Sequence, residues 1–595
     1  MTIPTTTTAA TVEDPLAQTV AHHQKGVAPV KKEYLVNQEA LPAAEDPAST
    51  PSQPQENAAE EGGKREKTGG QNHKRSTKNK NKTRRDEPNK LCLKIAMGDE
   101  CKFGDKCTYS HDVESYLAHR EPDLGDRCIN YEQYGKCKYG MRCRYSGAHT
   151  TKDHKQMVDE EKVMATSGDN GCVMNEFGRD MQINLRKKNV QFPRSDEFAK
   201  ILQREAQEEA KEKEADDKVK KPDEEEALEG GRQEKRQRTS RGNIDYRGKT
   251  YLAPLTTVGN LPFRRVCKGF GVDITCSEMA IASNILQGQQ TEWALLKRHK
   301  CEDVFGVQLA GNRPEAIGRA AELISRECEV DFIDLNMGCP IDMAYNNGGG
   351  SALLNQPRKI GKIVRTMRYV TDCDVTVKFR TGVLKNDNIA HTLVPQFEEW
   401  DAALGTLHGR SRQQRYTKLA DWEYIAQCKK QTSKMPLFGG GDVLSWEEYW
   451  EHMEKRQCDG IMIGRGALIK PWIFKEIEEK KVWDISSRER LDILKDFAKF
   501  GMEHWGTDTL GINNVRRYLL EWQSFLHRYI PAGLLEVLPQ RMNERPPAFV
   551  GRDDLETLMA SEKAKDWIKI TEMILGPAPD DFTFVPKHKS NSYEG

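Results

Sequence analysis

Eight short apolar runs alternate with longer amphipathic segments between residues 250 and 464. The runs are TYLAP (250–254), VDITCSEM (272–279), VFGVQLA (304–310), FIDLNM (332–337), VTVKFR (375–380), LGTLH (404–408), PLFGG (436–440) and GIMIG (460–464). Several intervening segments, such as 314–326, 358–369 and 446–456, have a helical pattern. Strands separated by helices predict right-handed βαβ units and a parallel sheet. Eight units predict a TIM (β/α)8 barrel. The alternative is a doubly wound sheet, although no G-x-G-x-x-G follows the first run.

Longer helical patterns follow the last run, over residues 488–505, 513–531 and 554–574. We therefore expect an α/β barrel over residues 244–485, a helical domain over 486–577 and a tail over 578–595. The helical segments carry Arg516, Arg517, Arg528 and Arg541, which are candidate phosphate contacts or ordinary solvated side chains.

Composition separates the N-terminal part from the barrel. Hydrophobic residues make up 37% of the chain, below the roughly 45–50% that is usual for globular proteins. Residues 1–89 are rich in Thr, Ala, Pro, Gln and Glu, which predicts disorder. From Lys64 to Lys90 eleven basic residues stand against three acidic ones, which favours phosphate contact, nuclear import or a plain solvating tail. Residues 153–243 contain a highly charged stretch and are expected to be a partly helical linker.

Hydropathy and cysteine usage disfavour some classes of protein, whereas the net charge excludes none. The 91 basic and 91 acidic residues cancel overall, so unlike patches offset one another. No apolar run is long enough for a membrane span, and no secretory signal pattern opens the sequence. The 15 cysteines are an odd number, which favours metal or catalytic thiols in a reducing compartment over a disulfide scaffold. We expect a monomer that is cytoplasmic and nuclear.

Two cysteine–histidine clusters lie between residues 90 and 152. Their spacings are C-x8-C-x5-C-x3-H and C-x8-C-x5-C-x5-H, and the residues are Cys92, Cys101, Cys107, His111, Cys128, Cys137, Cys143 and His149. Three thiolates and one imidazole complete a closed tetrahedral shell, which predicts two structural zinc ions. Such short segments need the metal in order to fold. The alternative, unrelated buried cysteines, does not explain the tandem repeat.

The repeats resemble CCCH zinc fingers, a family that usually binds single-stranded RNA. The second repeat departs from the family in its longer final gap, before His149. Aromatic and basic residues are interleaved in the repeats, as base stacking and phosphate contact require, although some rings are expected to pack the small cores. They are Phe103, Tyr109, Tyr131, Tyr134, Tyr139, Tyr145, Lys102, Lys106, Lys136, Lys138, Arg142 and Arg144.

Glycine-rich turns follow the seventh and eighth runs of the barrel. GGGD and IGRG lie where this fold usually holds a phosphate, and Arg465 adds charge there. Lys378 and His408, at the ends of two other strands, could face the same ligand. A phosphate-bearing cofactor is implied, and FMN is the foremost candidate.

Several motifs resemble the tRNA-dihydrouridine synthase family. They are APLTTVGNLPFRR, VQLAGNRPE, NMGCPIDM, VKFRTG, LHGRSRQQRYTKLADWEYI and GRGAL, and they extend over residues 244–477. RSRQQRYTKLADW and the two fingers resemble the eukaryotic branch that modifies uridine 47 of the tRNA variable loop. The resemblance implies a flavoenzyme that uses FMN with NADPH or NADH, and tRNA as substrate, with mRNA as a further candidate.

The resemblance also implies site residues. The catalytic acid falls on Cys339. FMN contacts fall on Pro254, Leu255, Thr256, Gln308, Lys378, His408, Gly440, Gly441, Asp442, Gly464 and Arg465. Gly440 stands where the family often has Asn, and Asn346 and Asn347 stand where basic residues are common.

Reducing the uracil 5,6 double bond needs a hydride and a proton. A flavin supplies the hydride, to carbon 6, because no side chain can. Cys339 would protonate carbon 5, and a free thiol with a pKa of about 8.5 is largely protonated at pH 7. Two rival functions are a flavin barrel acting on free pyrimidines and an RNA-binding protein without catalysis.

Overall fold

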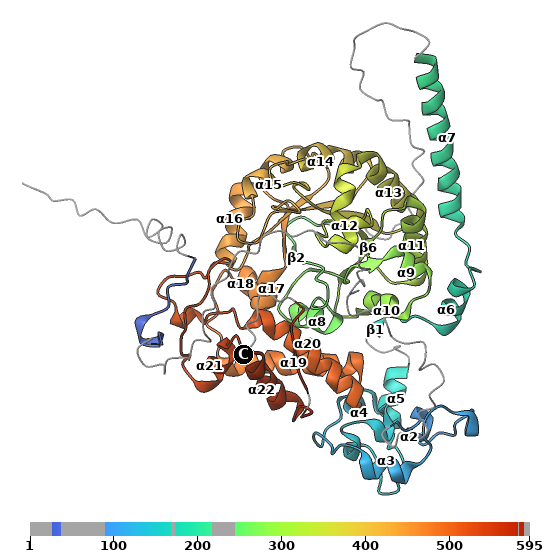
Figure 1. Cartoon of the computed structure of the whole chain (residues 1–595), viewed down its shortest axis with the longest axis vertical. Helices are drawn as coiled ribbons and strands as arrows, with labels where there is room; N and C mark the ends of the chain where they lie inside the picture. The colour runs from blue at the N-terminus through green and yellow to red at the C-terminus, as the bar shows by residue number, and fades with distance from the viewer. Residues whose placement is uncertain (1–25, 37–89, 168–172, 217–243, 581, 588–595) are drawn as a thin grey trace, which may run out of the picture. The chain divides into compact units, whose positions relative to one another are not determined.

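The computed structural model describes residues 26–36, 90–167, 173–216, 244–580 and 582–587 (Figure 1). Most of the basic run from Lys64, residues 217–243 of the predicted linker and the end of the tail lie outside these residues. The chain forms two compact units. One holds the barrel and helical domain, and the other contains the cysteine–histidine repeats together with residues 507–509.

Eight parallel strands form the predicted barrel. They are β2 (Thr250–Leu252), β3 (Ile274–Cys276), β6 (Val304–Ala310), β7 (Phe332–Met337), β8 (Asp374–Arg380), β9 (Leu404–His408), β10 (Leu437–Gly440) and β11 (Gly460–Ile463). The sheet closes because β3 pairs with both β2 and β6. All eight apolar runs therefore became strands, and the doubly wound alternative is excluded. A short ninth strand, β4 (Ala280–Ile281), extends the β6 pairing.

Amphipathic helices surround the barrel, as the spacing predicted (Figure 1). They include α8 (Leu261–Gly269), α11 (Pro314–Glu327), α13 (Pro357–Val370), α14 (Ala390–Glu399), α15 (Trp422–Lys429) and α16 (Trp446–Arg456). Shorter helices are α9 (Ala282–Leu286), α10 (Gln290–Trp293), α17 (Arg465–Ile469) and α18 (Ile473–Glu479). Their apolar faces and the outer faces of the strands form one continuous core.

The inside of the barrel has two chemically different levels. A lower level is apolar, with Tyr251, Ile274, Phe332, Leu404 and Phe438 in one cluster. Because side chains alternate along a strand, positions two residues further on face the same interior. On β6, β7 and β8 the inward positions toward the carboxyl ends are polar, and they include Gln308, Asp334, Thr376 and Lys378. The change from apolar to polar positions marks the end of the barrel where binding is expected.

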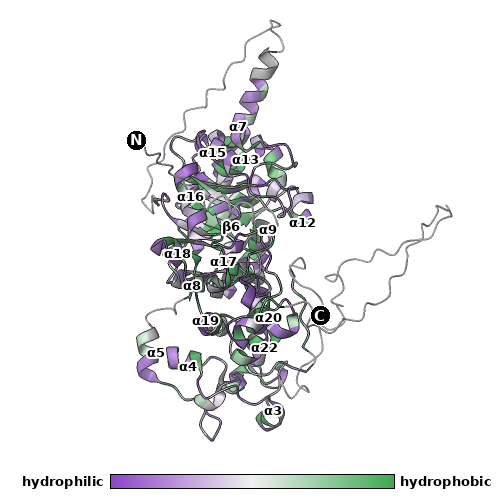
Figure 2. Ribbon diagram, turned by 90° about the vertical axis from the view of Figure 1, so that its left-hand side faces the viewer, coloured by the Kyte–Doolittle hydropathy of each residue, from purple (hydrophilic) through white to green (hydrophobic). Residues whose placement is uncertain are grey.

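Residues 173–216 belong to the barrel unit. A linker was expected over 153–243, so this part of the prediction was wrong. Strand β1 (Val173–Met174) pairs with β5 (Arg298–His299), and α6 (Arg179–Arg186) buries Leu185. Helix α7 (Pro193–Asp216) packs against α11 and α13, then runs away from the barrel as a largely hydrophilic ribbon (Figure 2). Its start is held by Glu322, which accepts from the Ser195 hydroxyl at 2.6 Å. Composition could not predict this packing, because Glu322, the buried residue that holds the start of α7, is far away in the sequence.

The segment expected as a helical domain, residues 486–577, forms helices within the same compact unit as the barrel. Ser486 and Glu489 form a capping box at the start of α19 (Ser487–Trp505). The domain continues with α20 (Thr509–Leu526), η9 (Ala532–Leu534), α21 (Asp554–Ala560) and α22 (Ala564–Leu575). Its core is continuous with the barrel core, since Leu519 and Trp522 belong to the same cluster. No described helix has the length and apolar composition that crossing a membrane requires.

Residues 26–36 are ordered, so the expected disorder of the first 89 residues does not hold for them. The Ala28 amide donates to the Arg545 carbonyl at 2.9 Å, and Glu536 donates to the Pro29 carbonyl at 2.8 Å. Ala28 and Val30 are buried against an apolar cluster of the helical domain, and η1 (Lys32–Tyr34) follows. We call residues 26–36 the N-terminal strap.

Candidate active site and zinc sites

The predicted flavin residues lie at the carboxyl ends of the barrel strands. Four of them lie within the last three residues of a strand: Gln308 in β6, Lys378 in β8, His408 in β9 and Gly440 in β10. Gly464 and Arg465 come directly after β11, and Pro254 to Thr256 follow β2. Parallel strands of a closed barrel place these ends around one mouth.

Two arginines and one carboxylate form a corner after β9, β10 and β11. Arg465 donates to Asp442 Oδ1 at 2.7 Å, and Arg410 donates to the other oxygen of the same carboxylate. Both guanidinium groups also lie over the ring of Tyr416. The Asp442 carboxylate also accepts from the Ala420 amide at 2.9 Å, so its side chain positions the arginines. A cofactor contact from Asp442 would therefore have to come from its backbone.

The same corner has the donors that a phosphate needs. The Nη1 atom of Arg410 and the Nδ1 atom of His408 are buried and have no hydrogen-bond partner among the described residues. A Cβ atom added at Gly464 would make ordinary van der Waals contact with Ala253 Cβ at 3.5 Å and with Leu255 Cδ2 at 3.6 Å, so the glycine keeps the backbone clear of a side chain at that position. Gly441 has a φ of 139°, a conformation that favours glycine. These features fit the phosphate of a flavin nucleotide.

Positive charge is concentrated at the mouth. Burial, together with the charges of Arg380 and Lys378, holds the pKa of His408 well below its usual value. Burial also lowers the pKa of Lys378 to about 8, and Arg380 contributes to that shift. The imidazole is therefore neutral at pH 7, whereas the lysine is largely charged. An anionic ligand is favoured in such a field.

The loop that carries Cys339 follows β7. The Cys339 amide donates to Asn336 Oδ1 at 2.9 Å, and its carbonyl accepts from the Ser351 hydroxyl at 2.9 Å. The residue is 9% exposed. Gly350 has a φ of 57°, and a Cβ there would approach Cys339 Cβ to 3.0 Å. The loop includes α12 (Asp342–Asn346) and η8 (Gly350–Asn355), so the thiol sits on a segment held at both sides.

The loop after β2 supplies the remaining predicted residues. Pro254 and Leu255 are half-buried and Thr256 is exposed. Thr257 has a φ of 74°, and its amide donates to Glu278 at 2.6 Å. The Glu278 carboxylate thus holds this loop at the barrel mouth.

Three residues of the mouth were missed from the sequence. Arg410 lies beyond the end of β9, Arg380 ends β8 and donates to the Gly338 carbonyl at 2.7 Å, and Asn336 holds the cysteine loop. Arg380 and Arg410 stand within the quoted VKFRTG and LHGRS motifs, so their charge beside a strand end was a usable signal.

The helical-domain arginines differ from the expected phosphate contacts. Arg516 is buried and donates to Thr571 at 2.8 Å, and Arg528 is buried and donates to the Met542 carbonyl at 3.0 Å. Arg541 lies 3.5 Å from Glu448, whereas Arg517 is exposed. Arg516 and Arg528 are therefore structural donors, because tertiary packing buried both side chains.

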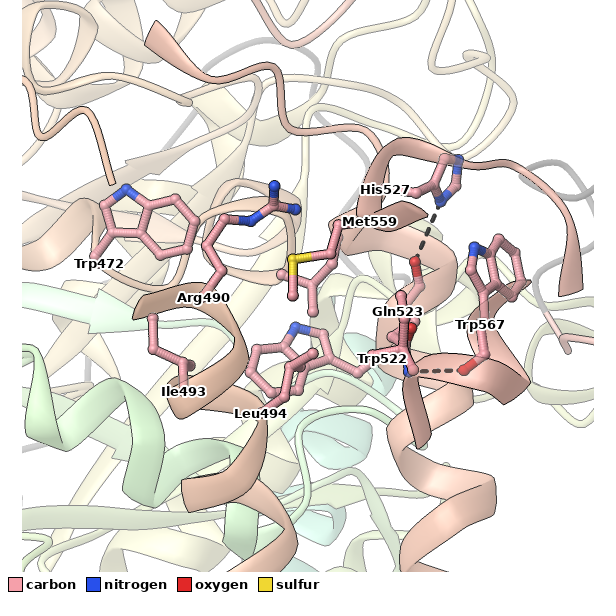
Figure 3. A pocket seen from close by; sticks show the side chains of 11 residues that line it. Trp472, Arg490, Ile493, Leu494, Trp522, Gln523, His527, Met559 and Trp567 are labelled. Atoms are coloured by element: carbon pink, nitrogen blue, oxygen red, sulfur yellow. Dashed lines mark hydrogen bonds between the residues drawn. The ribbon is translucent and has the colours of Figure 1, made fainter. Parts of the chain in front are cut away.

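A small cavity is lined mainly by residues of the helical domain (Figure 3). Its walls include the rings of Trp472, Trp522 and Trp567, together with Arg490 and His527. Neither Cys339 nor a predicted flavin residue lines it. This cavity is therefore separate from the candidate active site.

The second unit contains both cysteine–histidine groups. In each group the ligand atoms lie within 4.8 Å of one another, and they are Cys92, Cys101, Cys107 and His111, then Cys128, Cys137, Cys143 and His149. His149 thus lies with the three cysteines of its repeat despite the longer gap. Both of its ring nitrogens are buried and have no hydrogen-bond partner among the described residues, which fits a metal ligand.

The two repeats pack against each other through a small core. Leu91, Ala96, Tyr116 and Met141 form one buried cluster, and a Cβ at Gly140 would meet the Ala96 carbonyl oxygen at 1.9 Å. The helices of residues 90–167 are α2 (Leu93–Ala96), η4 (Gly104–Lys106), α3 (Val113–His119), α4 (Ile129–Tyr134), η5 (Gly140–Arg142), η6 (Ser146–Ala148) and α5 (Glu160–Ser167).

Not all of the predicted RNA-facing residues of the repeats are available at the surface. Phe103 is 69% exposed, whereas Tyr145 is buried. The four lysines are exposed, but Arg144 pairs with Glu121 and Arg142 with Asp508. Phe103 is therefore the strongest candidate for base stacking, and Tyr145 serves the core.

Comparison with known proteins agrees with this architecture. The dihydrouridine synthase (Dus) family model matches residues 251–507, and a DUS3L CCCH zinc finger domain model matches residues 88–119. A Homo sapiens protein named tRNA-dihydrouridine(47) synthase [NAD(P)(+)]-like is 48% identical over 536 residues, covering 85% of this chain and 82% of the relative. A Coprinopsis cinerea protein named tRNA-dihydrouridine(47) synthase [NAD(P)(+)] is 40% identical, covering 96% of this chain and 98% of the relative.

Solved structures that align include morphinone reductase, with a TM-score of 0.30 at 11% identity, covering 39% of this chain and 86% of that one. The barrel assignment rests on the strand pairing itself. The strand pairing defines an α/β barrel, and the family match makes it an oxidoreductase. With relatives this similar over most of their length, the chain belongs to the dihydrouridine synthase family.

Proposed function

We propose that this protein reduces uridine to 5,6-dihydrouridine in tRNA, at position 47 of the variable loop. The observation that carries the proposal is the placement of Cys339 after β7, in the same barrel mouth as the Arg410–Asp442–Arg465 corner. The names of the relatives, which specify position 47 and NAD(P)(+), support the substrate and the reductant.

The residues of the corner would hold the phosphate of FMN, with Arg410, Arg465 and the backbone at Gly440, Gly441 and Gly464 as contacts. Lys378 and His408 would face the same cofactor from β8 and β9. When bound and reduced by NADPH or NADH, FMN supplies the hydride that carbon 6 of uracil requires.

Cys339 would hold the proton that carbon 5 requires. Its peptide is fixed on one side by Asn336 and on the other by Ser351, so the thiol has a defined approach to a base in the mouth. A base in folded tRNA must leave its stack to reach this position. The finger unit would bind the RNA, with two zinc ions as structural elements.

Mapping of dihydrouridine in tRNA from cells that lack the protein tests the proposal. Loss of the modification at position 47 is the expected result, and retention there would refute the specific assignment. An absorbance scan of the purified protein separates a flavoenzyme from a non-catalytic RNA-binding protein. An assay on tRNA against free uridine separates it from an enzyme of free pyrimidines. Modification of mRNA, a monomeric state and a cytoplasmic and nuclear location stay predictions.

A further inference from the structure

A line of buried polar side chains connects the centre of the barrel to the cysteine loop. Gln308, Asp334 and Thr376 lie directly opposite one another on β6, β7 and β8. Each of the three is 1% exposed. The Asp334 carboxylate accepts from Gln308 Nε2 at 2.8 Å and from the Thr376 hydroxyl at 2.7 Å.

The line continues one level higher in the barrel. Asn336, two residues after Asp334 on β7, donates through Nδ2 to Gln308 Oε1 at 2.7 Å. Asn336 Oδ1 then accepts from the Cys339 amide at 2.9 Å and from the Gly338 amide at 3.2 Å. Two side chains, those of Gln308 and Asn336, thus join Asp334 to the backbone of the residue that carries the thiol.

The direction of each hydrogen bond in this line follows from its two ends. An ionised carboxylate only accepts, so Gln308 must turn its NH2 group toward Asp334. The backbone amide of Cys339 only donates, so Asn336 must turn its oxygen toward the loop. The carboxamides between them then have one consistent orientation, in which Gln308 Oε1 meets Asn336 Nδ2.

Ionisation of Asp334 suits this role. Burial raises the pKa of Asp334 to about 6, and the Gln308 and Thr376 hydrogen bonds oppose the rise. The carboxylate is therefore the acceptor-only end of the line at pH 7.5. Buried polar networks of this kind restrict conformation only when every member is satisfied.

We propose that Asp334 is a positioning residue which, through Gln308 and Asn336, sets the conformation of the Gly338–Cys339 segment and so the placement of the Cys339 thiol. The catalytic part of this inference rests on the proposed function of Cys339. The placement of the thiol is a separate, measurable property. Without an acceptor at 334, the Gln308 carboxamide can rotate. Its oxygen then no longer fixes the orientation of the Asn336 carboxamide.

Three variants of the flavin-loaded protein test the proposal. Asp334→Ala removes the acceptor. Asp334→Asn keeps an oxygen for Gln308, because the Thr376 hydroxyl can turn and accept from the new NH2 group. Thr376→Val is the matched control, since it removes only the hydrogen bond to the other carboxylate oxygen. Asp334→Leu, of similar volume, replaces the alanine variant if that protein does not fold.

Two readouts are needed. The first is single-turnover oxidation of the reduced flavin by tRNA, and the second is the rate at which iodoacetamide labels Cys339, followed by peptide mass spectrometry. We expect Asp334→Ala to slow the first by about tenfold or more, a tenfold change in rate being about 1.4 kcal/mol of activation free energy. The labelling rate should change by at least about threefold, while Asp334→Asn and Thr376→Val stay close to wild type in both.

Wild-type labelling and turnover in the alanine or leucine variant would overturn the proposal. Equal losses in Asp334→Asn and Asp334→Ala would also overturn it, because the carboxylate would then act through its charge. If Cys339→Ala itself kept the wild-type turnover, the proposed function of Cys339 would fail. The labelling rates would still decide whether Asp334 places the thiol.

Discussion

Arg465, directly after β11, reaches Asp442 beyond the end of the neighbouring strand β10, with Nη2 2.7 Å from Oδ1. The contact keeps the guanidinium over Tyr416 and beside Gly464, where a phosphate is expected. Arg465→Met should raise the dissociation constant for FMN by about tenfold or more, because it removes one charge-assisted hydrogen bond to the phosphate. Lys should restore the affinity only in part, because it lacks the planar fork.

Titration of apoprotein with FMN, followed by flavin fluorescence, measures this effect. Lys455→Met is the matched control, since Lys455 is 65% exposed in the last turn of α16. An Arg465→Met protein with unchanged affinity would show that the corner does not bind the cofactor.

Cys339→Ala should leave flavin content unchanged and slow uracil reduction by about two to four orders of magnitude. The alanine keeps the backbone bonds to Asn336 and Ser351 but has no proton to deliver. The measurement is single-turnover oxidation of reduced flavin by tRNA, and a wild-type rate would rule out the acid role.

The affinity for FMN should fall as the pH rises through about 8. Burial lowers the pKa of Lys378 to about 8, so its positive charge is present below that pH and is lost above it. An anionic ligand therefore binds less well on the alkaline side. Dissociation constants measured from pH 6.5 to 9.5 should show this step, and Lys378→Met should remove it. An identical step in the Met variant would assign the titration to another group.

His149→Ala should lower the zinc content from two ions per chain to about one. His149 lies with three cysteines whose ligand atoms are within 4.8 Å of one another, and a three-ligand site would bind the metal more weakly. His154→Ala is the matched control, because His154 is exposed and outside both groups. Elemental analysis of the purified proteins decides the matter. Two ions retained in His149→Ala would exclude this histidine as a ligand.

Much of the barrel could be predicted because its strands are short, buried and rich in β-branched residues. The run 332–337 coincides with β7, and 304–310 coincides with β6. The position of Cys339 after β7 followed from the same pattern. Local sequence was sufficient there, since burial on both faces leaves a strong hydrophobic signal.

Other features depend on partners that are distant in the sequence. From the sequence, Arg516 was a candidate surface cation. In the structure its guanidinium is buried and donates to the Thr571 hydroxyl and the Gly576 carbonyl. The direction of the Gln308 carboxamide depends on Asp334 and Asn336, on a neighbouring strand. No local pattern encodes such pairings, because the burial that makes them favourable arises only when the elements pack.

The N-terminal strap has a practical consequence for the protein in the cell and in the laboratory. Ala28 and Val30 cover Ile530, Leu534 and Phe549, and the Ala28 amide donates to the Arg545 carbonyl. A chain that starts or is cleaved after Tyr34 would leave this apolar strip open to water and to other chains. Such a shortened protein should be less soluble and more prone to self-association, even with the barrel and both fingers intact.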